Sequence, residues 1–274
     1  MLANDITRDR LRRLAEARVG DAKVLSVFLN LDPREFATPA ARSTEVRSRL
    51  DRAGRLVREE SERLTHEQKE SLRADLERVA GAIGGVARVA VADLTDAGQA
   101  RALAANAGPV DVLVVNAGAN QPEEFLDVDE ATFDRLFALN VRAGFFLAQA
   151  VVRTMPAGGV IVFVSSQMGH VGAERRTVYC ATKHAVEGLV RALALELAPR
   201  GVRVVSVAPT FVRTAMTSAQ LDDPEIGARL RAQIPLGRPA TPEEVADAVT
   251  WLASPRAAMT TGSSLLVDGG WTAR

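Results

Sequence analysis

Five short apolar runs alternate with longer amphipathic stretches over residues 84–274, and this alternation strongly constrains the fold. Each run is shorter than a typical helix and most are rich in valine, as buried parallel strands are. Strands that alternate with helices predict a parallel sheet with helices on both faces, and ligands then bind beyond the carboxyl ends of the strands. The runs are VARVAVA (86–92), VDVLVV (110–115), VIVFVS (160–165), VRVVSV (202–207) and SLLVD (264–268).

The first 83 residues have a different composition. They hold almost as many charged side chains as residues 84–274, which are more than twice as numerous. The apolar run KVLSVFLN (23–30) in this segment predicts one buried strand, and the stretches around it have helical spacing. The sequence therefore predicts a helix-rich N-terminal segment, residues 1–83, followed by an α/β domain, residues 84–274.

Overall charge and apolar content exclude several classes of function. The 34 basic side chains balance 34 acidic ones, so no strong field for nucleic acid or a membrane surface is expected. The most apolar window, 141–152, is well short of the ~20 residues of a membrane helix. No signal peptide is recognisable, and a single cysteine excludes an intramolecular disulfide, so we expect a cytoplasmic location.

Tyr179 is the only tyrosine in the chain, and Lys183 follows it by about one helical turn. In a helix this spacing places both side chains on one face, although such a pair also occurs on ordinary helices. The pKa of a phenol is ordinarily ~10, and an ammonium within ~5 Å favours the phenolate. The hydroxyl of Ser166, after the run 160–165, can hold a substrate oxygen while the tyrosine gives or takes a proton. These side chains predict the interconversion of an alcohol and a ketone.

Several further motifs accompany this pair in order along the chain. They are Asp93 after VAVA, Asn116-Ala117-Gly118 after VDVLVV, Asn140 in FALNVRAGFF, Pro209 in VSVAPTFVRTAM, and the closing TGSSLLVDGGWTAR. Ser166 stands thirteen residues before Tyr179. With these motifs, residues 85–274 resemble the short-chain dehydrogenase/reductase family. The resemblance implies a Rossmann-like, doubly wound parallel sheet and an NAD- or NADP-dependent oxidoreductase.

The resemblance also implies a role for each matching residue. Tyr179 would be the general acid/base, Ser166 would orient the substrate carbonyl, and Lys183 would lower the pKa of Tyr179 and bind the nicotinamide ribose. Asn140 would hold a water molecule in a proton relay. The implied cofactor contacts are Asp93, Asn116, Ala117, Gly118, Tyr179, Lys183, Pro209, Val212 and Thr214, and the candidate substrate pocket contains Arg213, Met216 and Thr217. A tetramer or dimer is implied as well.

The glycine-rich turn that opens this family is missing. Members begin with a strand, a turn of the Thr-Gly-x-x-x-Gly-x-Gly type and a helix that binds the cofactor pyrophosphate. Here the glycines near Gly81 follow a predicted helix and precede a strand, which is the reverse order. We predict that Val24–Asn30 replaces the first strand, giving about six strands, and that the exit from Leu31 to Glu35 binds phosphate poorly.

The replacing segment, about residues 5–80, faintly resembles the N-terminal region of bacterial proteins related to archaeal and eukaryotic peptide-chain release factors. The chain is therefore interpreted as a fusion. A third reading gives this segment a translation-associated role, but its nearly balanced charge gives no electrostatic support for RNA binding.

The sequence favours oxidoreduction of a small substrate, with sugar acids or polyols suggested by the stretches SSQMGHVGAERRTVYCATKHAVEGL and DGGWTA. The alternative is a cofactor-incompetent fusion or interaction module that keeps Asn140, Ser166, Tyr179 and Lys183 without turnover. His66, His170 and His184 do not cluster along the sequence, so no metal site is expected, and no Gly-x-Ser-x-Gly motif surrounds Ser166.

Overall fold

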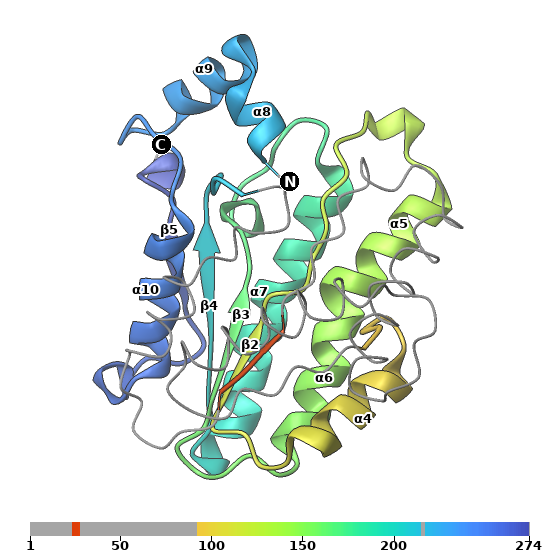
Figure 1. The fold of residues 1–274 in the computed structure, drawn as a ribbon, viewed down its shortest axis with the longest axis vertical. Helices are drawn as coiled ribbons and strands as arrows, with labels where there is room; N and C mark the ends of the chain where they lie inside the picture. The colour runs from red at the N-terminus through yellow and green to blue at the C-terminus, as the bar shows by residue number, and fades with distance from the viewer. Residues whose placement is uncertain (1–23, 28–91, 215–216, 274) are drawn as a thin grey trace, which may run out of the picture. The chain divides into compact units, whose positions relative to one another are not determined.

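The computed structural model describes residues 24–27, 92–214 and 217–273 of the chain (Figure 1). Two compact units divide the chain, residues 1–18 with 33–93 and residues 19–32 with 94–274. The elements below belong to the second unit. The predicted helices of the N-terminal segment, and all but the last residue of the predicted strand 86–92, lie outside the described residues.

A five-stranded parallel sheet forms the centre of this unit, with its strands in sequence order, β1-β2-β3-β4-β5. The strands are β1 (Val24–Val27), β2 (Val112–Val115), β3 (Val160–Val164), β4 (Arg203–Pro209) and β5 (Ser264–Val267). All residues of β2 are buried, as are most of β3 and β4, which explains why their sequences are continuous apolar runs rather than alternating ones.

β1 pairs in parallel with β2, with Val24 opposite Val112 and Val27 opposite Val115. Within the described residues, the inner strand β2 therefore has partners on both sides. The replacement of a missing first strand by Val24–Asn30 stays a prediction. The described residues give five strands rather than the expected six, because the run 86–92 falls almost entirely outside them.

Helices connect the strands, and their bounds follow the sequence signals closely. They are α4 (Ala97–Ala107), α5 (Glu130–Phe137), a π-helical turn η2 (Ala138–Arg142), α6 (Ala143–Val152), α7 (Thr177–Leu197), α8 (Ser218–Asp222), α9 (Pro224–Gln233) and α10 (Pro242–Ala253). Asp96, Asp129 and Asp223 accept hydrogen bonds at the N-termini of α4, α5 and α9, and Thr241 and Glu244 form a capping box on α10.

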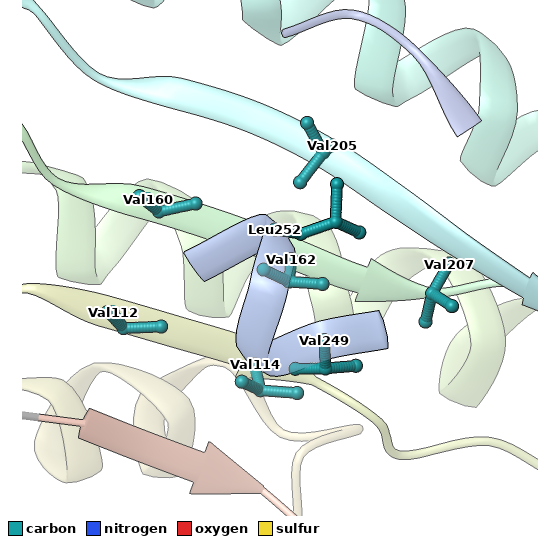
Figure 2. Packing of buried hydrophobic residues seen from close by; sticks show 8 residues of the cluster. All are labelled: Val112, Val114, Val160, Val162, Val205, Val207, Val249 and Leu252. Atoms are coloured by element: carbon teal, nitrogen blue, oxygen red, sulfur yellow. The ribbon is translucent and has the colours of Figure 1, made fainter. Parts of the chain in front are cut away.

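One face of the sheet packs against α10. Val249 and Leu252 of this helix form a core cluster with alternate valines of β2, β3 and β4 (Figure 2). The members from the strands are Val112, Val114, Val160, Val162, Val205 and Val207. The strand period of two places these valines on a single face, so α10 covers three strands with a small number of apolar side chains.

The opposite face packs against α6 and α7. Val115, Phe163 and Ser206 lie side by side in the register of β2, β3 and β4. A Cβ atom at Gly144 of α6 would lie 3.0 Å from Val115 Cγ1 and 3.3 Å from a Phe163 ring carbon, so a glycine is needed for this close approach. Ser206 donates a hydrogen bond to Glu187 of α7.

The continuous helix Glu130–Val152, formed by α5, η2 and α6, is long and apolar enough by composition alone to span a membrane. Leu136, Leu139, Leu147 and Val151 of this helix are buried within the protein. We therefore assign it to the core of the α/β unit.

Candidate active site

Polar side chains gather where three adjacent strands end. β2 leads into Asn116-Ala117-Gly118, and β3 into Ser165 and Ser166. β4 ends at Pro209 and is followed by Thr210. Because the strands are parallel and in register, their carboxyl ends lie at the same edge of the sheet, where ligands bind in open α/β folds.

Ser166 begins a short turn, η3 (Gln167–Gly169), that brings the chain from β3 towards α7. Its hydroxyl oxygen accepts a hydrogen bond from Met168 N at 3.1 Å and interacts with Tyr179. A Cβ atom at Gly169 would lie 3.0 Å from both Glu187 Cγ and Lys183 O, so this turn packs tightly against α7. The packing fixes the serine relative to the tyrosine.

Tyr179 and Lys183 lie one turn apart in α7, as their spacing predicts. The Lys183 Nζ atom is 5.6 Å from the centre of the Tyr179 ring. It donates a hydrogen bond to Val164 O, at the end of β3, with a length of 3.0 Å. Lys183 is buried, whereas Tyr179 is only partly buried. The structure therefore brings Ser166, Tyr179 and Lys183 together.

The ionisation of this pair differs from the expectation based on the sequence. Burial raises the pKa of Tyr179 to about 12, against smaller opposing effects of the Ser166 hydrogen bond and the Arg176 charge. Burial also lowers the pKa of Lys183 to about 8, opposed by the charge of Glu187. The pKa of Tyr179 is raised rather than lowered, because the loss of water around the phenol outweighs the Ser166 hydrogen bond and the Arg176 charge. The phenol of Tyr179 is therefore protonated at neutral pH. A lowering contributed by Lys183 itself stays a prediction.

Asn140 lies in the π-helical turn η2 and is buried. Its Oδ1 accepts from Ala119 N at 2.8 Å, while its Nδ2 donates to Ala119 O at 2.9 Å and to Thr182 Oγ1 at 3.0 Å. The side chain thus ties the loop after β2 to α7. The two bonds from Nδ2 use both hydrogens of the side-chain amide. The expected role of Asn140 in holding a relay water stays a prediction.

Gly118 lies beside two members of the site. A Cβ atom there would lie 3.3 Å from Asn140 Oδ1 and 3.8 Å from Lys183 Nζ. A side chain at Gly118 would therefore crowd Asn140 and contact Lys183, so the glycine leaves room for the backbone beside these two residues. Ala117 is buried in this loop, and Asn116 is partly buried.

Buried polar atoms at this edge lack protein partners within the described part of the chain. They are Asn120 Oδ1, Ser165 Oγ, Thr210 Oγ1 and both amide atoms of Gln167. They belong to the segments that follow β2, β3 and β4. Unpaired buried polar atoms are costly, so their concentration at one edge fits a site that a polar ligand completes. This end of the site fits a nicotinamide and its ribose, whose amide and hydroxyl groups can supply the missing bonds.

Several described residues after β4 are held by backbone and side-chain contacts. Val212 is bridged to Ala240, Thr214 N donates to Thr217 Oγ1 at 3.1 Å, and the Thr217 hydroxyl donates to Val212 O. Arg213 forms an exposed ion pair with Asp222 of α8 at 2.7 Å. Met216 lies outside the described residues, and Asp93 belongs to the other compact unit.

One buried polar cluster was missed by the sequence analysis. Glu187 of α7 accepts hydrogen bonds from Ser206 of β4 and Ser264 of β5, and His170 Nε2 lies 3.1 Å from Ser264 Oγ. The spacing of Tyr179, Lys183 and Glu187, four residues each, was the available signal, because it places all three on one helix face. No group of three or more potential metal-ligating side chains occurs within the described ranges.

With this geometry established, the comparisons with known proteins assign the family. The family model described as enoyl-(acyl carrier protein) reductase matches residues 52–272. L-xylulose reductase of Bos taurus is 41% identical over 203 residues, covering 73% of this chain and 83% of that protein. The chain belongs to the short-chain dehydrogenase/reductase family of oxidoreductases.

Further relatives are named for similar activities. Galactitol 2-dehydrogenase (L-tagatose-forming) of Cereibacter sphaeroides is 41% identical over 207 residues, covering 73% of this chain and 82% of that protein. A crystal structure of a putative NAD(P)-dependent gluconate 5-dehydrogenase from Beutenbergia cavernae, with bound NADP at low occupancy, has a TM-score of 0.70 and 37% identity, covering 75% of this chain and 84% of that one.

These relatives confirm the family and the Rossmann-like parallel sheet that the sequence predicted. They are named as reductases and dehydrogenases, and they give no support to the alternative of an interaction module without turnover. The resemblance of the N-terminal segment to release-factor relatives is not supported by them either. The family match begins at residue 52, before the predicted boundary at residue 84, and that boundary stays a prediction.

Proposed function

We propose that this protein is an NAD(P)-dependent oxidoreductase that interconverts a ketose or related keto compound and the corresponding polyol. The observation that carries the proposal is the convergence of Ser166, Tyr179 and Lys183 beside the loop 116–118. A nicotinamide cofactor supplies or accepts the hydride when bound. All other parts of the reaction fall to the side chains of this chain.

In the reduction direction, the Ser166 hydroxyl orients the substrate carbonyl oxygen towards Tyr179. The phenol of Tyr179 is protonated at neutral pH, since its ordinary pKa of about 10 is raised by burial to about 12, and we propose that it donates its proton to that oxygen. Lys183 and Arg176 then stabilise the phenolate that remains, since positive charges near the ring favour its ionised form. Oxidation of the alcohol uses the same groups in reverse.

The residues proposed to hold the nicotinamide end are Asn116, Ala117 and Gly118 after β2, Lys183 on α7, and Pro209, Val212 and Thr214 after β4. Ser165 Oγ and Thr210 Oγ1, unpaired among the described residues, support a polar ligand at this position. Asp93 is proposed to lie near the adenine. The proposed phosphate exit after β1, Leu31 to Glu35, lies outside the described residues.

The substrate class is proposed from the printed names of the relatives, which include L-xylulose reductase, D-erythrulose reductase and galactitol 2-dehydrogenase. A polyhydroxylated substrate also suits the polar edge, where the buried Gln167 amide atoms have no partner among the described residues. Arg213, Met216 and Thr217 are proposed to contribute to the substrate pocket. A homo-oligomer, either a tetramer or a dimer, is proposed from the family resemblance. A cytoplasmic location is proposed from the single cysteine.

The test is a turnover assay on the full chain with NADPH and, separately, NADH. L-xylulose, D-erythrulose and L-tagatose are offered for reduction, and galactitol for oxidation, with cofactor absorbance followed over time. We expect at least one of the two cofactors to be oxidised when a ketose is present. In Tyr179→Phe the rate of this oxidation should be lower by several orders of magnitude. Turnover that is equal in this variant would contradict the assigned role of the tyrosine. No turnover with any of these pairs would contradict the proposed substrate class.

A further inference from the structure

A buried carboxylate lies behind the tyrosine and lysine pair, on the same face of α7. Glu187 is 2% exposed, and its oxygens accept hydrogen bonds from Ser206 Oγ at 2.9 and 3.1 Å and from Ser264 Oγ at 3.3 Å. These donors come from β4 and β5, so the cluster joins α7, the helix that carries Tyr179, to two strands of the sheet. The proposed reaction does not use these groups directly.

A carboxylate in such an environment needs a positive charge nearby, because neutral hydroxyl donors do not replace the solvation it loses on burial. Lys183 is the buried ammonium that precedes Glu187 by four residues, or about one turn, on the same helix. Each of these groups lowers the electrostatic cost of burying the other. The Lys183 ammonium also loses water on burial, and a nearby negative charge favours its protonated form.

The packing leaves Glu187 little freedom to leave this place. A Cβ atom at Gly169 would lie 3.0 Å from Glu187 Cγ, so the turn η3 packs directly against the Glu187 side chain. Ser206 holds it from β4, where the neighbouring strand positions are completely buried. The carboxylate is therefore a fixed charge rather than one that moves with solvent.

We propose that Glu187 is a positioning residue that keeps the Lys183 ammonium charged and aimed at the end of β3, so that the lysine can stabilise the Tyr179 phenolate. This role rests on the proposed function, but it makes a separate statement about the ionisation of Lys183. It assigns a purpose to the spacing of four residues from Tyr179 to Lys183 and from Lys183 to Glu187.

The other titratable groups around Lys183 belong to α7 and to the turn packed against it. Tyr179 and Cys180 lie on α7, Arg176 at its N-terminus, and His170 follows η3. His170 Nε2 is 3.5 Å from Glu187 Oε1, and 22% of the His170 side chain is exposed, so His170 also faces this carboxylate.

The test uses the small number of lysines in the chain. Only Lys23, Lys69 and Lys183 are present, so carbon-13 labelling of lysine side chains gives three NMR signals, and Lys183→Arg identifies the signal of Lys183. We expect that signal to titrate near pH 8 in the full-length wild-type protein. In Glu187→Gln, which keeps the side-chain size and an oxygen acceptor for Ser206, we expect the midpoint to fall by about one pH unit.

Glu196→Gln is the matched control, because Glu196 lies on the same helix and is exposed. It should leave the midpoint of Lys183 unchanged. An unchanged midpoint in folded Glu187→Gln would overturn the proposal. If that variant does not fold, the wild-type protein decides through labelled glutamate: the Glu187 signal should shift as Lys183 loses its proton, and a signal that does not respond would equally overturn it.

This readout requires neither cofactor nor turnover. A protein that binds no nicotinamide but shows the expected shift would contradict the proposed function and leave the role of Glu187 in place. A protein that turns over normally, but in which Glu187→Gln does not shift the Lys183 midpoint, would contradict the role of Glu187 and leave the proposed function in place. Where turnover is found, Glu187→Gln is expected to lower kcat more than it changes KM, and Glu187→Asp, which keeps the charge, to restore part of it.

Discussion

Single residues at the carboxyl edge of the sheet are held in place by contacts that the sequence only partly reveals. The spacing of Ser166, Tyr179 and Lys183 correctly predicted that they meet. The direction of the tyrosine pKa was not predictable, because it depends on how far the ring is removed from water. Linear spacing indicates which side chains share a helix face but not how deeply the surrounding loops bury them.

The ionisation of Tyr179 gives a prediction that needs no ligand. Because it is the only tyrosine, the absorbance change of tyrosinate formation reports this residue alone. Burial raises the pKa of Tyr179 to about 12, so the folded protein should form no tyrosinate at pH values where an exposed phenol is half ionised, at about 10. The chain unfolded in urea is the control and should titrate near that ordinary value. A folded protein that titrates there as well would contradict the raised pKa of Tyr179.

Asn140 gives a second prediction at this scale. Replacing it with alanine leaves the N–H and C=O of the buried Ala119 without their partner, while the hydroxyl of Thr182 keeps its hydrogen bond to Tyr179 O. We expect Asn140→Ala to lower the free energy of unfolding by about 1–3 kcal/mol, the usual cost of unsatisfied buried groups. Denaturant unfolding measures this change. Asn106→Ala, at an exposed position on α4, is the control and should change stability by less than about 0.5 kcal/mol. Equal effects would contradict the clamp role of Asn140.

The elements follow the sequence well where pattern alone determines them. The four runs that the structure describes in the α/β domain became β2 to β5 with end points shifted by one or a few residues. The run at Val24–Asn30 became the shorter strand β1 beside β2. The π-helical turn at Asn140 was not predicted, because Leu136, Leu139, Ala143 and Leu147 keep ordinary helical spacings of three or four residues across it.

Alanine substitutions at two helical glycines separate the effect of packing on stability from the effect of helix propensity. Gly144→Ala places a methyl group 3.0 Å from Val115 Cγ1, and we expect it to destabilise the protein by about 1–3 kcal/mol through overpacking. Gly188→Ala is the matched change on α7, where nothing lies within 4 Å of the new Cβ atom. There we expect a gain of up to about 1 kcal/mol, because alanine is the better helix former. Thermal unfolding measures both changes, and a gain at Gly144 would contradict the close approach of α6 to the sheet.

At the scale of the whole molecule, the described unit is a parallel sheet whose two faces are covered by different helices. α10 packs on one face, and α6 and α7 on the other (Figures 1 and 2). The sequence predicted this class of fold and the edge that carries the site. It could not establish the function of the N-terminal segment, because the motif that would normally bind the cofactor phosphates is absent from it.

The central claim is that this chain still binds a nicotinamide cofactor despite that absence. The most direct test is calorimetric titration of the purified full-length protein with NADPH and, separately, with NADH, using Tyr179→Phe as a variant that should bind but not turn over. The account predicts saturable binding of at least one cofactor with one site per chain, unchanged within a few-fold in the variant. Absence of binding to either cofactor at millimolar concentration would contradict it.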